Sequence, residues 1–175
     1  MNLIQLYPHQ DYRGESVTIN EDNPNLSTLG ILKTTQSLVV SGDPWIVYSD
    51  INYQGAFKCF KAGNYSTLSL WGNKIKSVRV VKGGLDNPGI TLYEDVNYEG
   101  RAVVLKAHVD SLKTHDFDKK ALSHKVTQGA WILYSADAFS GDKMIMLMGD
   151  EVPDYSEINW QNKLSSLEPA VGGDG

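Results

Sequence analysis

One stretch of this chain reads YSDINYQG and occupies residues 48–55. Two aromatic residues, Tyr48 and Tyr53, are separated by four mostly polar residues, and Gly55 follows after one further residue. This spacing predicts a hairpin that folds back over a sheet, so that the two aromatic rings cover apolar surface. Glycine suits the end of such a hairpin because it tolerates a positive φ that a Cβ atom would penalise.

The same pattern occurs four times and aligns without gaps. Each copy is followed by a serine that lies 29 to 32 residues after its leading tyrosine. The repeated positions are Tyr7, Gly14 and Ser37; Tyr48, Gly55 and Ser77; Tyr93, Gly100 and Ser123; and Tyr134, Gly141 and Ser166. We expect each serine hydroxyl, on a later strand, to satisfy backbone groups that the folded hairpin leaves open.

The second and fourth copies share features that the first and third lack. Trp45 and Trp131 lie three residues before the leading tyrosine of the even copies, and both even copies carry Asn-Lys-aliphatic-x-Ser at their ends. This alternation predicts two domains of two copies each, and not four equal blades. We expect a first domain over residues 1–82, a linker over 83–88, a second domain over 89–171 and a flexible tail over 172–175.

Each copy reads as a set of short strands. Runs such as Val17–Ile19, Val78–Val81 and Met144–Leu147 are rich in β-branched or apolar residues, and turn formers such as those at 86–88 separate the runs. Long amphipathic helices are absent from the pattern. Many short strands with frequent turns predict an all-β protein with sandwich domains.

The composition is that of a globular protein, with 41% hydrophobic and 21% charged residues. A formal net charge of −5 argues against nucleic acid as a partner, because a protein that tracks phosphates needs a concentrated basic face. No apolar run approaches the roughly 20 residues that a membrane span requires. The single cysteine, Cys59, and the lack of a recognisable secretion signal favour a cytoplasmic location.

The fourfold pattern of paired aromatics, glycine and distant serine, in alternating order, resembles the βγ-crystallin family. The resemblance covers roughly residues 1–171. It implies two domains, each a pair of four-stranded Greek key sheets packed face to face, and a structural or interaction role. A single cysteine and an excess of acidic over basic residues differ from typical lens γ-crystallins, so a non-lens role is expected.

The resemblance also bears on calcium. Calcium-binding members of the family carry Asn/Asp-Asn/Asp-x-x-Ser/Thr-Ser, and this loop pairs with a hairpin of the other copy. The first three copies depart from the pattern, for example at Lys33, Gln36 and Lys76. The fourth departs only at its first position, and its candidate ligands with the partner hairpin are Asn162, Ser165, Glu94 and Asp95. Either calcium or no cofactor is therefore expected, and a calcium-stabilised protein is the first alternative function.

The even copies also predict an apolar contact between domains, formed within one chain or between two chains. In similar crystallins the matching positions make this contact. The predicted patch consists of Ile46, Cys59, Val81, Ile132, Ile145 and Ala170. Both faces of the run Met144–Met148 are apolar, so its second face needs a cover.

Catalytic motifs are absent from the sequence, including HExxH, GxSxG, a phosphate-cradling glycine loop and paired CxxC. The sequence therefore predicts that the chain is not an enzyme.

His108 and His115 lie among three aspartates, and we interpret this stretch as a solvated connection. The tyrosines and tryptophans mostly occupy repeat positions, so core packing explains them better than a carbohydrate platform. A further alternative is a recognition module of a larger, pore-forming or membrane-acting protein, the one case in which a membrane partner is expected.

Overall fold

The computed structural model describes residues 1–30 and 34–172. The chain folds into two compact units, Met1–Lys82 together with the C-terminal residues from Val171, and Gly83–Ala170. Lys33 of the first calcium-type segment lies outside the described residues, as does the predicted tail except for Gly172. Each unit is described by itself below.

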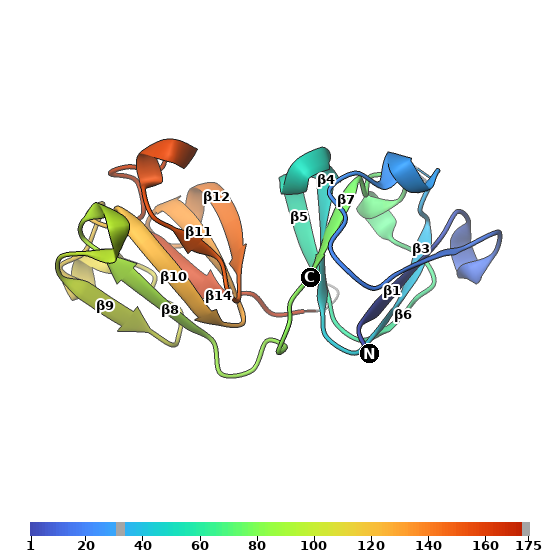
Figure 1. Cartoon of the computed structure of the whole chain (residues 1–175), viewed down its shortest axis with the longest axis horizontal. Coiled ribbons are helices and arrows are strands. Elements are labelled where there is room, and N and C mark those ends of the chain that lie inside the picture. Colours follow the sequence, from blue (N-terminus) through green and yellow to red (C-terminus); the bar gives the residue numbers. More distant parts are fainter. Residues whose placement is uncertain (31–33, 173–175) are drawn as a thin grey trace. The chain divides into compact units, whose positions relative to one another are not determined.

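The first unit contains two antiparallel sheets (Figure 1). The four-stranded sheet has the order β2-β1-β3-β6, and the three-stranded sheet has the order β5-β4-β7. The strands are β1 (Leu3–Tyr7), β2 (Val17–Ile19), β3 (Ser37–Ser41), β4 (Trp45–Asp50), β5 (Gln54–Phe60), β6 (Gly63–Tyr65) and β7 (Ser77–Val80).

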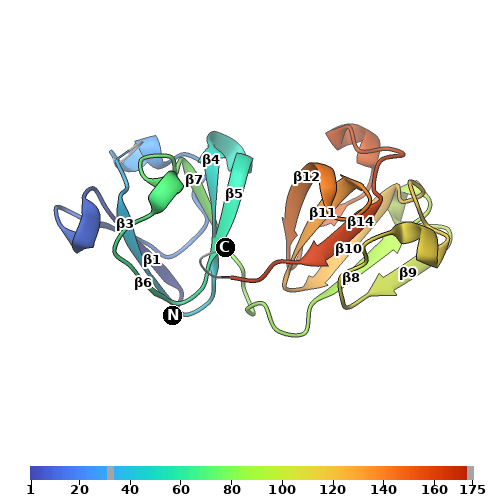
Figure 2. The same cartoon turned by 180° about the vertical axis from the view of Figure 1, so that it is seen from behind.

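The second unit repeats this arrangement and is seen from behind in Figure 2. Its four-stranded sheet has the order β13-β10-β8-β9, and its three-stranded sheet has the order β12-β11-β14. The strands are β8 (Gly89–Tyr93), β9 (Ala102–Leu105), β10 (Ser123–Gln128), β11 (Ala130–Ala136), β12 (Ser140–Leu147), β13 (Glu151–Val152) and β14 (Ser166–Pro169).

All helical segments in the described residues are short 3₁₀ turns. They are η1 (Gln10–Tyr12), η2 (Leu26–Leu29), η3 (Ile51–Tyr53), η4 (Ser69–Trp71), η5 (Val96–Tyr98), η6 (Leu112–His115) and η7 (Tyr155–Ile158). Side chains of Asn25, Ser111 and Asp154 cap three of them by accepting a backbone N–H from two residues further on. No helix in this part of the chain is long and apolar enough to cross a bilayer.

In both units, one copy contributes a strand to the sheet of the other copy. Strand β6 of the second copy pairs with β3 of the first, and β13 of the fourth copy pairs with β10 of the third. In return, the odd copies reach the three-stranded sheets through single bridges, Asn23 with Val78 and Val109 with Leu167.

These second sheets therefore have three strands, whereas four were expected. The physical reason is the turn that follows each bridge. Two residues after Asn23 and Val109, the caps Asn25 and Ser111 begin a 3₁₀ turn, which leaves no extended backbone for a longer strand.

Each unit has its own hydrophobic core between its two sheets. Trp45 in the first unit and Trp131 in the second are fully buried at equivalent strand positions. Large aromatic side chains contribute the greatest apolar area to such a core. The two-domain, all-β sandwich predicted from the repeat is confirmed, with one core for each pair of copies.

Candidate functional site

The repeated hairpin has the same geometry in all four copies. The centroids of the paired rings lie 5.7, 5.6, 5.7 and 5.8 Å apart in chain order, at the edge-to-face or tilted angles that aromatic pairs prefer. In every copy, the second aromatic residue and the residue before it both have a positive φ, between 56° and 61°. Two successive left-handed residues turn the chain sharply enough to bring one ring against the other.

One buried serine hydroxyl closes each hairpin. It accepts a hydrogen bond of 3.1 Å from the backbone N–H of the second aromatic residue. It also donates one of 2.6 or 2.7 Å to the carbonyl three residues before that aromatic. The four serines, Ser37, Ser77, Ser123 and Ser166, are each 0% exposed. A single side chain thus satisfies two backbone groups of the hairpin.

The glycine of the motif is required by space as well as by conformation. Gly55 and Gly100 have φ values of 84° and 76°. A Cβ atom at Gly55 would lie 2.4 Å from Ser49 Oγ, and one at Gly100 would lie 2.5 Å from Asp95 Oδ2. Both distances are shorter than a van der Waals contact, so a Cβ atom would displace these side chains in addition to straining the backbone.

The acidic half of the calcium candidate lies in the hairpin of the third copy. Glu94 Oε2 forms an ion pair of 3.0 Å with Arg101 Nε, and both side chains are partly exposed. The backbone carbonyl of Asp95 accepts the hydroxyl of Ser123. The side chain of Glu94 is thus paired with a residue next to its own hairpin, and the backbone of Asp95 is tied to β10.

The other half lies in the loop before β14. Asn162 is exposed and has a φ of 61°, whereas Ser165 is 2% exposed. The backbone N–H of Ser165 donates to the Tyr134 carbonyl at 3.0 Å, and its hydroxyl donates to the Lys163 carbonyl at 3.3 Å. Among the described residues, no hydrogen bond joins this loop to Glu94 or Asp95, and the calcium site stays a prediction.

The aspartates and histidines of residues 108–118 make separate contacts. Asp116 forms ion pairs with Lys120 at 3.0 Å and Arg101 at 3.8 Å, and the His108 ring packs against Phe139. Within residues 1–30 and 34–172, no three His, Cys, Asp or Glu side chains gather in a metal-binding cluster.

The predicted apolar patch occupies matching positions in the two units. Ile46 of β4 lies directly opposite Cys59 of β5, and Ile132 of β11 lies directly opposite Ile145 of β12. Val81 and Ala170 follow β7 and β14. Their backbone N–H groups donate at 2.8 Å to the carbonyls of Pro44 and Ala130, the residues just before Trp45 and Trp131. All six are described residues, and none belongs to the core cluster of its own unit.

A buried polar pair escaped the sequence analysis. His124 Nδ1 lies 2.6 Å from the Tyr155 hydroxyl, and both side chains are 0% exposed. Burial lowers the pKa of His124 to about 4, although Asp150 opposes the shift. The position of His124 in the repeat could have revealed its burial. The residue after the repeat serine is apolar in the other three copies, where it is Leu38, Val78 or Leu167.

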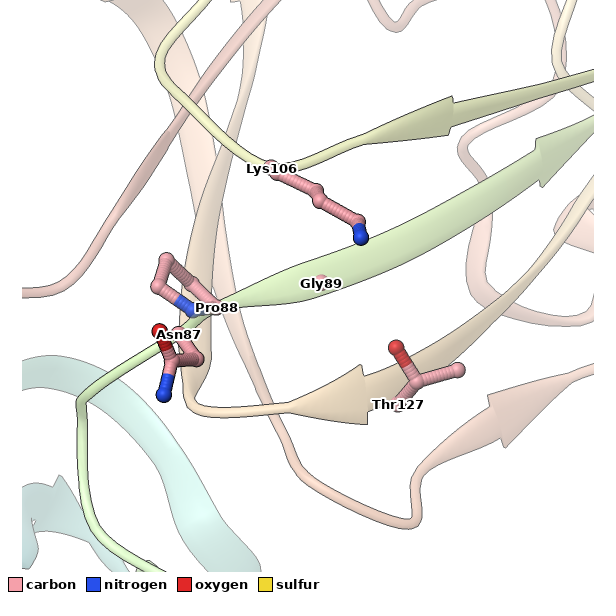
Figure 3. A pocket seen from close by; sticks show the side chains of 5 residues that line it. All are labelled: Asn87, Pro88, Gly89, Lys106 and Thr127. Atoms are coloured by element: carbon pink, nitrogen blue, oxygen red, sulfur yellow. The ribbon is translucent and has the colours of Figure 1, made fainter.

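A hollow of about 500 Å³ lies at the start of β8 (Figure 3). The side chain of Lys106 extends over β8 beside Gly89, and Thr127 stands on β10 on the other side of that glycine. A Cβ atom at Gly89 would come 2.6 Å from Thr127 Oγ1, so a side chain here would crowd that hydroxyl. Asn87 and Pro88 complete its lining, and Lys106 carries its single formal charge.

Comparison with known proteins identifies the family. The sequence model described as Beta/Gamma crystallin matches residues 3–81 and 89–170. The chain belongs to the βγ-crystallin family. Members of this family are in general not enzymes.

Several βγ-crystallins are similar to this one over nearly its whole length. The chain is 32% identical to the epidermal differentiation-specific protein of Cynops pyrrhogaster over 173 residues, which are 99% of this chain and 51% of that protein. It is 28% identical to the human Beta/gamma crystallin domain-containing protein 1 over 174 residues, 97% of this chain and 8% of that protein. The chain therefore spans about half the length of the first relative and a small part of the second.

Among solved structures, a βγ-crystallin from Ciona intestinalis is 27% identical, with a TM-score of 0.43. The match covers 47% of this chain and 99% of that one.

Proposed function

We propose that this βγ-crystallin acts as a non-catalytic, non-lens structural or interaction protein whose domains pair through the apolar patch. The pairing forms within one chain or between two chains. The observation that carries the proposal is the patch itself, two apolar cross-strand pairs at the same register in the two units.

Strand alternation supports this role for the patch. Trp45 and Val47 belong to the core of the first unit, and Ile46 between them does not. Neighbouring residues of a strand point to opposite faces, so Ile46 and its partner Cys59 stand on the face away from that core. Apolar groups gathered on such a face mark an interaction surface. Burial of this patch contributes a few kcal/mol at about 25 cal/mol per Å².

The chemistry of Cys59 supports packing over reactivity. Burial raises the pKa of the Cys59 thiol to about 12, so the thiol stays protonated near neutral pH. The thiolate is the nucleophilic form of cysteine.

A cytoplasmic location and the absence of a nucleic-acid partner also belong to the proposal. The single cysteine supports the first, and the net charge of −5 supports the second.

The test is Ile145→Asp, which places a carboxylate in the patch. We expect the domains to uncouple while each stays folded, seen as two calorimetric unfolding transitions or a changed sedimentation coefficient. Val104→Asp is the control, because Val104 is 61% exposed on β9. The pairing proposal fails if Ile145→Asp unfolds like the wild type and keeps its hydrodynamic size.

A module of a larger, membrane-acting or pore-forming protein is the second candidate. The support is that the matched segment forms 51% of one relative and 8% of another. Sequencing the complete transcript tests this candidate, and a reading frame that stops after residue 175 contradicts it.

A further inference from the structure

A second hollow, of about 370 Å³, lies at the hairpin of the first copy. It is lined by His9, Gln10 and Arg13 of the hairpin and by Gln36, which precedes β3. These four side chains offer a guanidinium, an imidazole and two carboxamides. Asp11 belongs to the same hairpin, but it is exposed and does not line the hollow.

The third copy shows that the fold does not require these side chains. The backbone N–H of His9 donates to the carbonyl of Arg13 at 3.3 Å. In the third copy the equivalent hydrogen bond runs from the backbone N–H of Asp95 to the carbonyl of Glu99, at 3.1 Å. One backbone geometry therefore carries two basic side chains in the first copy and two carboxylates in the third. The basic pair is a property of this site and not of the hairpin.

Arg13 is exposed, and one hydrogen bond orients its guanidinium. Its Nε donates to the Gln10 carbonyl at 3.2 Å, while Nη1 and Nη2 form no hydrogen bond with any residue that the structure describes. The planar fork of arginine matches carboxylate and phosphate, which it binds through two parallel hydrogen bonds. The amides of Gln10 and Gln36 can add N–H donors beside it.

The imidazole of His9 is exposed and lies near Gly14. A Cβ atom built at Gly14 would lie 3.1 Å from His9 Cδ2, so a side chain at this position would crowd the ring. The hairpin is further anchored by the backbone N–H of Gln36, which donates to the Tyr7 carbonyl at 2.9 Å.

We propose that this hollow binds a small oxyanion, a carboxylate or phosphate group, between Arg13, His9 and the two glutamine amides. Arg13 supplies the charge and the bidentate contact. The site is independent of the domain-pairing proposal, because it lies within the first unit and shares no residue with the apolar patch.

The experiment is an NMR titration of the ¹⁵N-labelled full chain with inorganic phosphate, and separately with acetate, at constant ionic strength. We expect saturable shifts at residues 9–13 and at Gln36. Arg13→Gln should weaken the affinity at least tenfold, and Arg13→Lys should give an intermediate loss because it keeps the charge without the fork. Lys106→Gln is the matched control in the hollow of Figure 3 and should change nothing.

Saturation by either anion supports the site, and the ratio of the two affinities assigns the ligand class. The proposal is overturned if Arg13→Gln binds phosphate as the wild type does, or if the shifts centre on Lys106. It is also overturned if sodium chloride alone reproduces them. Gln36→Leu, which copies Leu122 of the third copy, provides a second test should Arg13→Gln fold poorly.

Discussion

At the residue scale, four serines and four aromatic pairs perform the same task with nearly identical geometry. Each serine hydroxyl bridges an N–H and a carbonyl on the two sides of the sharp turn. A buried backbone group without a partner costs as much as a lost hydrogen bond. Serine at this position therefore stabilises the folded hairpin.

Ser77→Ala removes two such hydrogen bonds at once, to the Tyr53 N–H and the Asp50 carbonyl. We expect the free energy of unfolding to fall by about 2 kcal/mol, because two backbone groups lose their hydrogen bonds to a buried hydroxyl at once. Urea unfolding measures the loss. Ser66→Ala is the control, since Ser66 is exposed, and it should stay within about 0.5 kcal/mol of the wild type. Equal effects of the two substitutions would show that the hydroxyl of Ser77 does not hold the hairpin.

Ala138 is the exception among the turn residues. It has a φ of 57° where the other copies have Asp11, Asn52 and Asn97. Asn and Asp adopt the left-handed region more readily than other residues with a Cβ atom. Ala138→Asn should therefore raise the free energy of unfolding by about 0.5–1 kcal/mol, measured by urea unfolding. Asn97→Ala, the reciprocal change, should lower it by a similar amount, and a gain in stability from Asn97→Ala would contradict this account.

At the element scale, β10 and η7 are joined by the buried pair of His124 and Tyr155. Tyr155 belongs to the core of the second unit, and its backbone N–H donates to the Leu122 carbonyl at 2.9 Å. His124 Nε2 is buried without a hydrogen-bond partner among the described residues. The ring is therefore held neutral in a place that disfavours its charged form.

This pair predicts how stability depends on pH. The folded pKa of His124 is about 4, below the unfolded value of about 6.5. Between those values the unfolded state binds a proton that the folded state does not. The free energy of unfolding should thus fall as pH drops from about 6.5 to about 4, by up to about 1.4 kcal/mol per pH unit.

The control is the double substitution His124→Leu with Tyr155→Phe, which removes both polar groups together. Denaturant unfolding across this pH range should show a shallower slope for the variant than for the wild type. Parallel curves for the two proteins would exclude His124 as the source.

At the scale of the whole molecule, charge and repeat order determine where a cation could act. The chain carries a net charge of −5, and the hairpin of the third copy contains Glu94, Asp95 and Glu99. The second copy has Lys76 at the position of Ser165, and an ammonium group there repels calcium.

If calcium binds, we expect it in the second unit near Asn162 and Ser165, where it should raise the Tm of the full chain. Ser165→Lys should abolish that rise, as measured by calorimetry with and without calcium. Lys76→Ser is the reciprocal control and should leave the rise in place. An undiminished rise in Ser165→Lys, or a calcium site beside Lys76, would remove this assignment.

The sequence by itself determined the all-β class, the pairing of copies into two domains and the form of the hairpin. These features depend on residues close in the chain, or on a pattern that recurs four times. An aromatic pair five residues apart and a glycine two residues later encode a local turn, and alternation of the copies identifies which two share a core. The family follows from the same residues.

Only the tertiary structure decided which distant side chains meet. In the three-stranded sheet of each unit, a single bridge stands where a fourth strand was expected, because a capped 3₁₀ turn follows Asn23 and Val109. The tertiary structure joined His124 to Tyr155, 31 residues apart, and placed Gln36 beside Arg13 in one hollow. Strand periodicity specifies which face a side chain points to, but the partner across that face depends on how the two copies interlock.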